Sequence, residues 1–446
     1  MLYSNQDLKK LILPLVMEQF LAILVGMIDM IMVSGVGEAA VSGVSLVDNI
    51  NVLIINISAA MATGGAVVAG HFLGQKDPES AGRAAWQLIF FSAITAVVTS
   101  VCVVVWHKPL LHVIFGQVEA DVMSSAVTYF TITALSITPL VIYNSCAALF
   151  RAMNSAKTTM WISILMNIVH VTINSILIYG VKLGVAGAAI STTISKTLAA
   201  SIILYLMFNP NKIINIKGKI TWKPDVGLIK KILYIGIPNG MENSLFQLGK
   251  IMLLSLISTF GTFAIAANAV CNTLAGFNIL PGQAINLALL SVAAVCVGAG
   301  DYKQARYYTK KLIWLAIAST GVISLLLIVF APWIMKIYNL SPETETLAIR
   351  VIRYHAAMAI ILWMPSFTVP NTLRAAGDVV WTMVIAIGSM WTFRIITSYV
   401  FSEYFGLGLM GVWIAMTIDW AFRAICYGHR YRGNKWERCM IEKGKS

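Results

Sequence analysis

The chain has 446 residues, of which 58% are hydrophobic and only 11% are charged, and its mean hydropathy is +0.80. Soluble domains carry about 25% charged residues, so this composition excludes an ordinary soluble protein and indicates an integral membrane protein. The formal net charge is +13, which could indicate a nucleic-acid partner. That interpretation is needed only if membrane topology does not explain the positions of the basic residues.

Long apolar runs predict twelve membrane-spanning helices. A helix needs about 20 apolar residues to cross the bilayer, and continuous rather than alternating runs favour helices over a β-barrel. The predicted spans are 11–33, 49–70, 86–106, 123–147, 160–180, 187–208, 232–258, 267–297, 312–334, 350–370, 379–401 and 409–427. The first ten residues contain no small-residue cleavage site, so no signal peptide is expected. The six cysteines show no paired spacing and predict neither a disulfide framework nor a metal site.

The basic residues follow this topology. With the N-terminus in the cytoplasm, 24 of the 32 Lys and Arg residues fall on the cytoplasmic side, counting Arg423 with the C-terminal tail, and five fall on the opposite side. This bias is the positive-inside rule, and it predicts a multi-pass protein of the cell (inner) membrane with both termini in the cytoplasm. The charge is then topological, and no nucleic-acid partner is expected.

The sequence contains an internal duplication at an offset of 223 to 224 residues. Loop and helix motifs keep this register in both halves, which chance similarity between apolar helices would not do. The matched stretches are Pro14, Met17 and Glu18 with Pro238, Met241 and Glu242, GQKDPESA from Gly74 with GAGDYKQA from Gly298, FRAMNSA from Phe150 with LRAAGDV from Leu373, and LGVAGAAI from Leu183 with LGLMGVWI from Leu407. Each half has six spans, and an even number of spans returns the chain to the side of the membrane on which it began. The two halves therefore have the same orientation.

The fold class predicted is therefore an all-α polytopic membrane protein, with two six-helix bundles related by a pseudo-two-fold axis along the membrane normal. The bundles are predicted at 1–208 and 232–427, with a basic cytoplasmic linker at 209–231 and a basic cytoplasmic tail at 428–446. Such duplicated halves suit a transporter that rocks about a central site.

The ordered set of motifs resembles the multidrug and toxic compound extrusion (MATE) family over the whole chain. It comprises the repeated G-x-x-D loops, FRAMNSAK, LRAAGD, NSILIYGVKLGVAGAA and FGLGLMGVWIA. The competing major facilitator architecture carries G-x-x-x-D-[RK]-x-G-[RK] after its second span, which GHFLGQKDPESAGR from Gly70 approaches only superficially. The resemblance implies a transporter with a cation-coupling cavity in its N-terminal half.

Charged residues inside the spans are candidate functional groups, because each costs on the order of 2.5 to 3.5 kcal/mol at the bilayer centre. Glu18 and Asp29 share one face of the first span, and Asn167, His170 and Asn174 lie on adjoining faces of the fifth. By resemblance, Asp29 is the carboxylate that takes part in cation coupling, with Asn174, His170 and Asn167 as its neighbours.

The fifth span departs from the family pattern. The family often has Asn-x-x-x-Asp where this chain has His170 and Asn174. Sodium prefers hard oxygen ligands, so the missing carboxylate weakens the case for Na⁺ and leaves Asp29 able to carry a proton. Both H⁺ and Na⁺ stay open as the coupling ion, and a Na⁺ at Asp29 is the one metal considered.

A second set of polar residues is predicted to line a substrate cavity or gate, because a polar stripe facing lipid would be too costly. It consists of Glu18, Glu242, Asn243, Gln247, Lys250, Asn272, Gln283 and Arg394. The duplicated Glu18 and Glu242 equally suit a symmetric structural or gate role. Arg394, Lys196 and Asp419 equally suit structural pairing.

The sequence thus predicts a cation-coupled antiporter, driven by H⁺ or Na⁺, that exports amphipathic, cationic organic compounds such as drugs by alternating access. It is expected to need no cofactor and to work in the lipid bilayer as a monomer. The alternative is a flippase for a lipid- or polysaccharide-linked precursor, which a net basic cavity would favour. An enzyme is not expected, because the sequence contains no H-E-x-x-H, G-x-S-x-G or P-loop motif.

Overall fold

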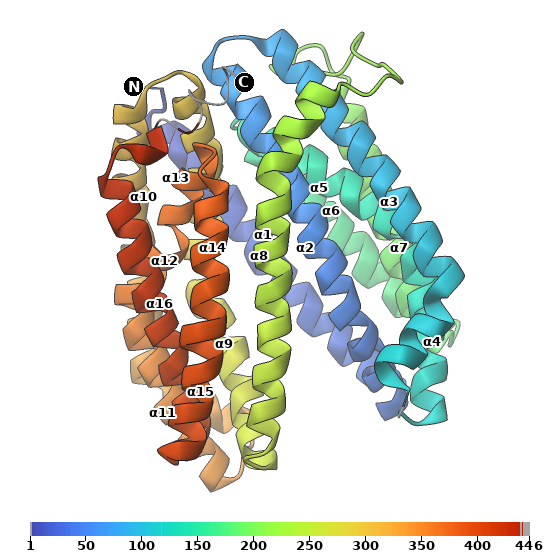
Figure 1. The fold of residues 1–446 in the computed structure, drawn as a ribbon. Coiled ribbons are helices and arrows are strands. Elements are labelled where there is room, and N and C mark those ends of the chain that lie inside the picture. The colour runs from blue at the N-terminus through green and yellow to red at the C-terminus, as the bar shows by residue number, and fades with distance from the viewer. Residues whose placement is uncertain (1, 117, 438, 440–446) are drawn as a thin grey trace. The chain divides into compact units, whose positions relative to one another are not determined.

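The computed structural model describes residues 2–116, 118–437 and 439, and within these the chain is helical without strands. Figure 1 shows the helices along the chain. They are α1 (Asn5–Ser34), α2 (Glu38–Gly74), α3 (Pro78–Phe115), α4 (Ala120–Ala134), α5 (Ile137–Ala152), α6 (Ala156–Ser175), α7 (Gly184–Met207), α8 (Val226–Ser258), α9 (Thr262–Gly298), α10 (Tyr302–Ile337), α11 (Pro342–Met358), α12 (Met364–Phe367), α13 (Val369–Ala375), α14 (Val379–Ser389), α15 (Thr397–Tyr399) and α16 (Gly408–Arg432). Four π-helical segments lie between them: η1 (Ile176–Gly180), η2 (Ala359–Trp363), η3 (Met390–Ile396) and η4 (Val400–Tyr404).

Each predicted span falls within one helix or within a run of consecutive helical segments. Among the described residues, ten helices are long and apolar enough to cross a membrane, or eleven if α4 and α5, which meet at a 50° bend, form one span. The remaining predicted span, 232–258, lies in α8, whose polar residues lower its hydropathy. The prediction of an all-α multi-pass membrane protein is confirmed.

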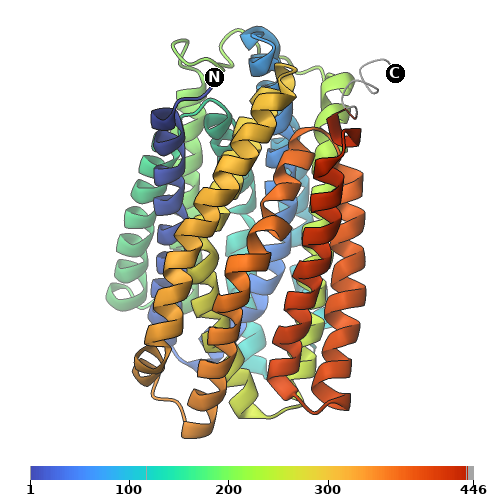
Figure 2. The same cartoon turned by 90° about the vertical axis from the view of Figure 1, so that its left-hand side faces the viewer.

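The chain divides into two compact units, Asn5–Gly240 and Met241–Ser446, the latter joined by Met1–Ser4. In the N-terminal unit, α2 packs against α3, α4 and α5, and α6 packs against α1 and α7. In the C-terminal unit, α9 packs against α10, α11 and α13, and α16 packs against α12, η3 and η4 (Figure 2). The predicted domain boundaries and the axis relating the halves stay predictions.

The segment predicted as a linker lies against the N-terminal unit. Ile214 and Ile216 are fully buried, and the indole of Trp86 on α3 donates a hydrogen bond to the carbonyl of Thr221. The amide of Gln87, also on α3, donates to Lys223 O, so the segment is packed along the start of α3.

The duplication is visible in the backbone as well as in the sequence. Residues with positive φ recur at the repeat offset in the turns between helices. The pairs are Gly37 with Gly261, Lys76 with Gly300, Asn154 with Gly377, and Lys182 with Gly406. The turn residues Asp77 and Asp301 also match, because each caps the following helix by accepting a hydrogen bond from the backbone N–H three residues later.

These turns differ in how well their residues tolerate the left-handed region. Lys76 has φ 59° where the second half has Gly300 with φ 72°. An L-residue with a Cβ pays about 1–2 kcal/mol in this region, whereas glycine enters it freely. The first turn therefore carries strain that the second lacks.

We expect Lys76→Gly to raise the stability of the protein by about 1 kcal/mol, because glycine removes the steric cost at this exposed position. Thermal unfolding in detergent should show a higher midpoint for Lys76→Gly and a lower one for Gly300→Ala. Lys76→Ala, which removes the charge but keeps the Cβ, is the matched control. An equal gain from Lys76→Ala would contradict the steric explanation.

Candidate functional site

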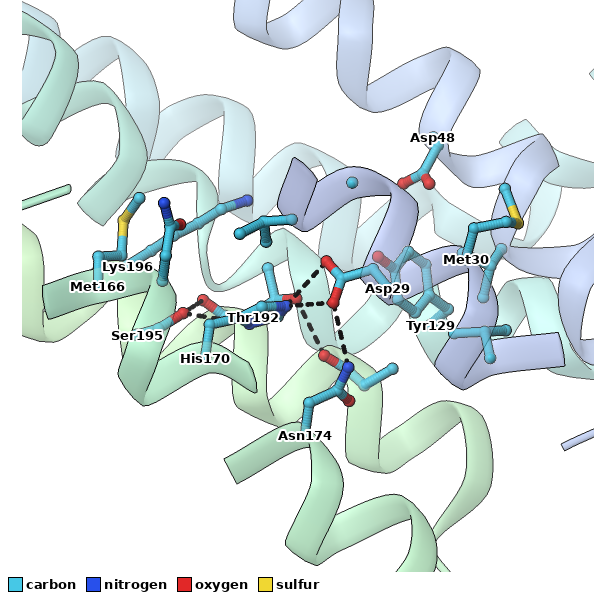
Figure 3. A pocket seen from close by; sticks show the side chains of 16 residues that line it. Asp29, Met30, Asp48, Tyr129, Met166, His170, Asn174, Thr192, Ser195 and Lys196 are labelled. Atoms are coloured by element: carbon cyan, nitrogen blue, oxygen red, sulfur yellow. Dashed lines mark hydrogen bonds and ion pairs between the residues drawn. The ribbon is translucent and has the colours of Figure 1, made fainter. Parts of the chain in front are cut away.

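A cavity of about 260 Å³ lies inside the N-terminal unit, between α1, α2, α4, α6 and α7. Its lining combines apolar residues with a dense group of polar ones, which Figure 3 shows from close by. The polar lining residues are Asp29, Asp48, Tyr129, Asn167, His170, Asn174, Thr192, Ser195 and Lys196. We call this cavity the N-terminal pocket.

The carboxylate of Asp29 holds α1 to α6. Nε2 of His170 lies 2.8 Å from both carboxylate oxygens, and Nδ2 of Asn174 donates to Oδ1 at 3.2 Å. His170 and Asn174 reach the same carboxylate because they lie one helical turn apart on one face of α6. The Asp29 side chain is 35% exposed, whereas His170 and Asn174 are buried, so the carboxylate is the accessible member.

The other side of the His170 ring meets two hydroxyl groups. Nδ1 lies 3.4 Å from Ser195 Oγ and 3.5 Å from Ser191 Oγ. Each hydroxyl donates its proton to a backbone carbonyl of α7, which leaves its oxygen free to accept. The site therefore accommodates an imidazolium that donates from both nitrogens, toward Asp29 on one side and the serines on the other.

The four residues predicted for cation coupling come together in this pocket. Asn167 also lines the pocket, one turn before His170 on α6. Oδ1 of Asn174 is buried and accepts no hydrogen bond from the described residues, so one oxygen next to the carboxylate is available to a ligand. The coupling role of these residues stays a prediction.

Sequence reasoning missed Asp48 as a lining residue and considered Lys196 only for structural pairing. The second span was predicted to begin at residue 49, immediately after Asp48. The structure begins α2 at Glu38, which places Asp48 inside the helix and on the pocket wall. Lys196 enters from α7.

The duplicated glutamates form equivalent ion pairs away from the pocket. Glu18 Oε1 lies 3.7 Å from Nη1 of Arg151, and Glu242 Oε1 lies 2.7 Å from Nη2 of Arg374. Each arginine stands in the last turn of α5 or α13, at the matching position of its half. A gate role for these glutamates stays a prediction.

The two units differ at the positions equivalent to the N-terminal pocket. At the 224-residue offset of the repeat, the position of His170 is occupied by Arg394 and that of Ser195 by Asp419. The position of Asp29 is occupied by Leu253, which is buried. Nη1 of Arg394 lies 3.9 Å from Asp419 Oδ2.

Arg423 corrects the sequence analysis. The topological count assigned it to the cytoplasmic tail, but it lies within α16 and is only 2% exposed. Its Nε donates to Asp419 Oδ1 at 2.8 Å, one helical turn away. A basic residue near the end of a span is therefore a buried partner of a carboxylate.

The other predicted cavity residues lie on α8 and α9. Within the C-terminal unit Lys250, Asn272 and Gln283 are exposed, and Asn243 and Gln247 are partly buried. The lining of the N-terminal pocket includes none of them, and their cavity role stays a prediction. In the described part of the chain, no group of three or more His, Cys, Asp and Glu residues could hold a metal ion.

The helices and the enclosed polar pocket define a polytopic membrane transporter. A family model described as MatE matches residues 14–176 and 238–400, one match in each half. The chain therefore belongs to the MatE family, which confirms the family predicted from the motifs, and it is a transporter rather than an enzyme.

Individual relatives cover almost the whole chain. A "Probable multidrug resistance protein NorM" of Thermotoga maritima is 24% identical over 98% of this chain and 94% of its own length. An "Uncharacterized transporter YisQ" of Bacillus subtilis is 28% identical over 97% and 94%.

Solved structures show the same fold. One described as MATE in complex with MaL6 has a TM-score of 0.89 at 21% identity, covering 98% of this chain and 96% of that one. A transporter from Pyrococcus furiosus, whose description reports reverse polarity of the binding pocket, has a TM-score of 0.90 at 20% identity, covering 97% and 96%.

The Glu242 to Arg374 pair, in which Nη2 of the arginine donates to both carboxylate oxygens at 2.7 Å, should stabilise the protein more than the Glu18 to Arg151 pair at 3.7 Å, because its contacts are shorter. Removing one partner of a buried pair leaves an uncompensated charge and costs about 3–5 kcal/mol. Arg374→Met should therefore be more damaging than the double variant Glu242→Gln with Arg374→Met. Unfolding midpoints of both double-mutant cycles measure this, and equal coupling energies in the two halves would refute it.

Proposed function

We propose that this protein is a secondary active exporter in which an inward gradient of H⁺ or Na⁺ drives expulsion of amphipathic, cationic organic compounds. Asp29 is the coupling group, with Asn174, His170 and Asn167 as its neighbours. The observation that carries the proposal is the accessible Asp29 carboxylate bridging α1 to α6 inside a polar pocket. The name of the Thermotoga maritima relative, "Probable multidrug resistance protein NorM", supports multidrug efflux.

Coupling requires that the ion and the transported compound stabilise different conformations, because a ligand that binds both equally shifts nothing. Asp29 belongs to α1 and its partners to α6. Neutralising the carboxylate removes the charge that attracts His170, so cation binding changes how tightly α1 is held to α6. This is the physical link between an ion in the pocket and a movement of helices.

The pocket offers chemistry for either ion. A proton needs only a carboxylate that can change its charge, which Asp29 supplies. A sodium ion needs several oxygens, and the free Oδ1 of Asn174 beside Asp29 supplies one more.

We further propose that the protein lies in the inner membrane with both termini in the cytoplasm and works as a monomer. Within the C-terminal unit, the backbone of Leu2 donates to Gln304 at the start of α10. Arg306, on the same turn, donates to the carbonyls of Tyr431 and Gly433. Both ends of the described chain thus lie beside one end of α10, which supports a shared side.

A second candidate function is a flippase for a phosphate-linked lipid precursor, because the C-terminal unit has more interior cations than carboxylates to balance them. Asp419 is already bound at 2.8 Å by Arg423. Arg394 keeps only the 3.9 Å contact, and its buried Nε lacks a hydrogen bond among the described residues. Lys250 adds a further positive charge on α8 in the same unit.

Asp29→Asn should reduce gradient-driven efflux of a cationic dye from proteoliposomes to the level of protein-free vesicles, because the amide cannot change its charge. Asp121→Asn removes an exposed carboxylate in the first turn of α4 and is the matched control. The pH and Na⁺ gradients are imposed separately. Unchanged efflux by Asp29→Asn under both gradients would refute Asp29 as the coupling group.

The flippase alternative is separated by its cargo. Vesicles carrying the wild-type protein should move the cationic dye and leave a fluorescent phosphate-linked isoprenoid lipid in its original leaflet, as judged by dithionite quenching. Lipid transfer that is lost in Lys250→Met but kept in Lys250→Arg would instead favour the flippase and an anion-binding role for the C-terminal unit.

A further inference from the structure

The N-terminal pocket contains a second pair of charges that the coupling proposal does not use. Asp48 enters from α2 and Lys196 from α7, and Figure 3 shows both in the pocket beside the contact between Asp29 and His170. The carboxylates of Asp29 and Asp48 and the ammonium group of Lys196 therefore line one cavity from three different helices.

Without Lys196 the pocket would resemble a site for a hard cation. It would hold the carboxylates of Asp29 and Asp48, the free Oδ1 of Asn174 and the phenol of Tyr129. Sodium and calcium bind to such sets of oxygen ligands. The cavity of about 260 Å³ is larger than a single ion needs.

The charge count of the pocket shows what Lys196 changes. The charged and titratable groups that face it are Asp29 from α1, Asp48 from α2, His170 from α6 and Lys196 from α7, while α4 contributes the neutral Tyr129. With an imidazolium at His170 the four charges sum to zero. Removing the lysine charge leaves one uncompensated negative charge, which one Na⁺ would neutralise.

We propose that Lys196 is a tethered cation that supplies, in the pocket it shares with Asp29 and Asp48, the positive charge that a sodium ion would bring, and that it thereby restricts the pocket to proton coupling. The inference rests on the proposed function for its link to transport, but not for its prediction about ion binding. Two like charges repel each other more strongly inside a protein than in water, because the effective dielectric constant is lower there. A sodium ion entering beside the ammonium group meets this repulsion, whereas a proton adds to a carboxylate without needing a vacant coordination site.

The test compares four forms of the full-length protein: wild type, Lys196→Met, Lys196→Arg, and Lys196→Met combined with Asp48→Asn. Binding of ²²Na⁺ to purified protein in detergent is measured first, because it does not depend on transport. We expect saturable binding of one Na⁺ by Lys196→Met only. Lys196→Arg retains the cation, and the double variant removes the surplus negative charge, so neither should bind.

Efflux of a cationic dye from proteoliposomes is the second readout. Wild-type efflux should respond to a pH gradient and not to a Na⁺ gradient, and Lys196→Met should gain a response to Na⁺. Saturable Na⁺ binding by the wild type, or none by Lys196→Met, would overturn the tethered-cation role. If Lys196→Met does not fold, Lys196→Gln replaces it with the same expectations.

The two proposals fail in different ways. Wild-type protein that moves dye under neither gradient contradicts the exporter function, while the ²²Na⁺ comparison still decides the role of Lys196. Wild-type efflux driven by Na⁺ leaves the exporter function intact and refutes the role of Lys196.

Discussion

The contact between Asp29 and His170 is the constraint on which the candidate site depends. A carboxylate inside a membrane is costly unless it is paired, and four interior carboxylates of the described chain have a basic partner, two in each unit. The pairs are Asp29 with His170, Glu18 with Arg151, Glu242 with Arg374, and Asp419 with Arg423. Of these four pairs, the one between Asp29 and His170 alone lacks an arginine, whose charge is permanent in proteins.

The duplication explains why this pair occurs in one half only. Both halves keep the same turns, with positive φ at matching positions, and the same glutamate to arginine pair. They diverge where His170 matches Arg394 and Asp29 matches Leu253. One copy of the ancestral unit holds a titratable pair facing a cavity, and the other holds a permanent charge next to Asp419. The scaffold is common to both, and the chemistry differs.

Much of this could be predicted from the sequence because it depends on local periodicity. Apolar runs gave the helices, the repeat gave the two halves, and the spacing of His170 and Asn174 placed both on one face of a helix. Asp48 was missed because hydropathy marks where a helix becomes apolar, and α2 begins eleven residues before the predicted span. Asp48 on α2 and Lys196 on α7 line the same pocket because of tertiary packing, which periodicity does not report. The partner of Arg423 was missed because a basic residue near a helix end reads as cytoplasmic.

The π-helical segments show which features of the site belong to the scaffold. The segments η1 (Ile176–Gly180) and η4 (Val400–Tyr404) lie 224 residues apart, so the widened turn is part of the duplicated unit. Such turns are often found at functional sites, and η1 follows Asn174 by two residues. The equivalent segment η4 follows Ser398, which has no side-chain amide. The hydroxyl of Ser398 donates to the carbonyl of Arg394. The π turn therefore does not by itself reproduce the contacts around Asp29. What distinguishes the N-terminal half is the residue before the turn, because Asn174 donates from its amide nitrogen to Asp29 while its Oδ1 accepts no hydrogen bond from the described residues.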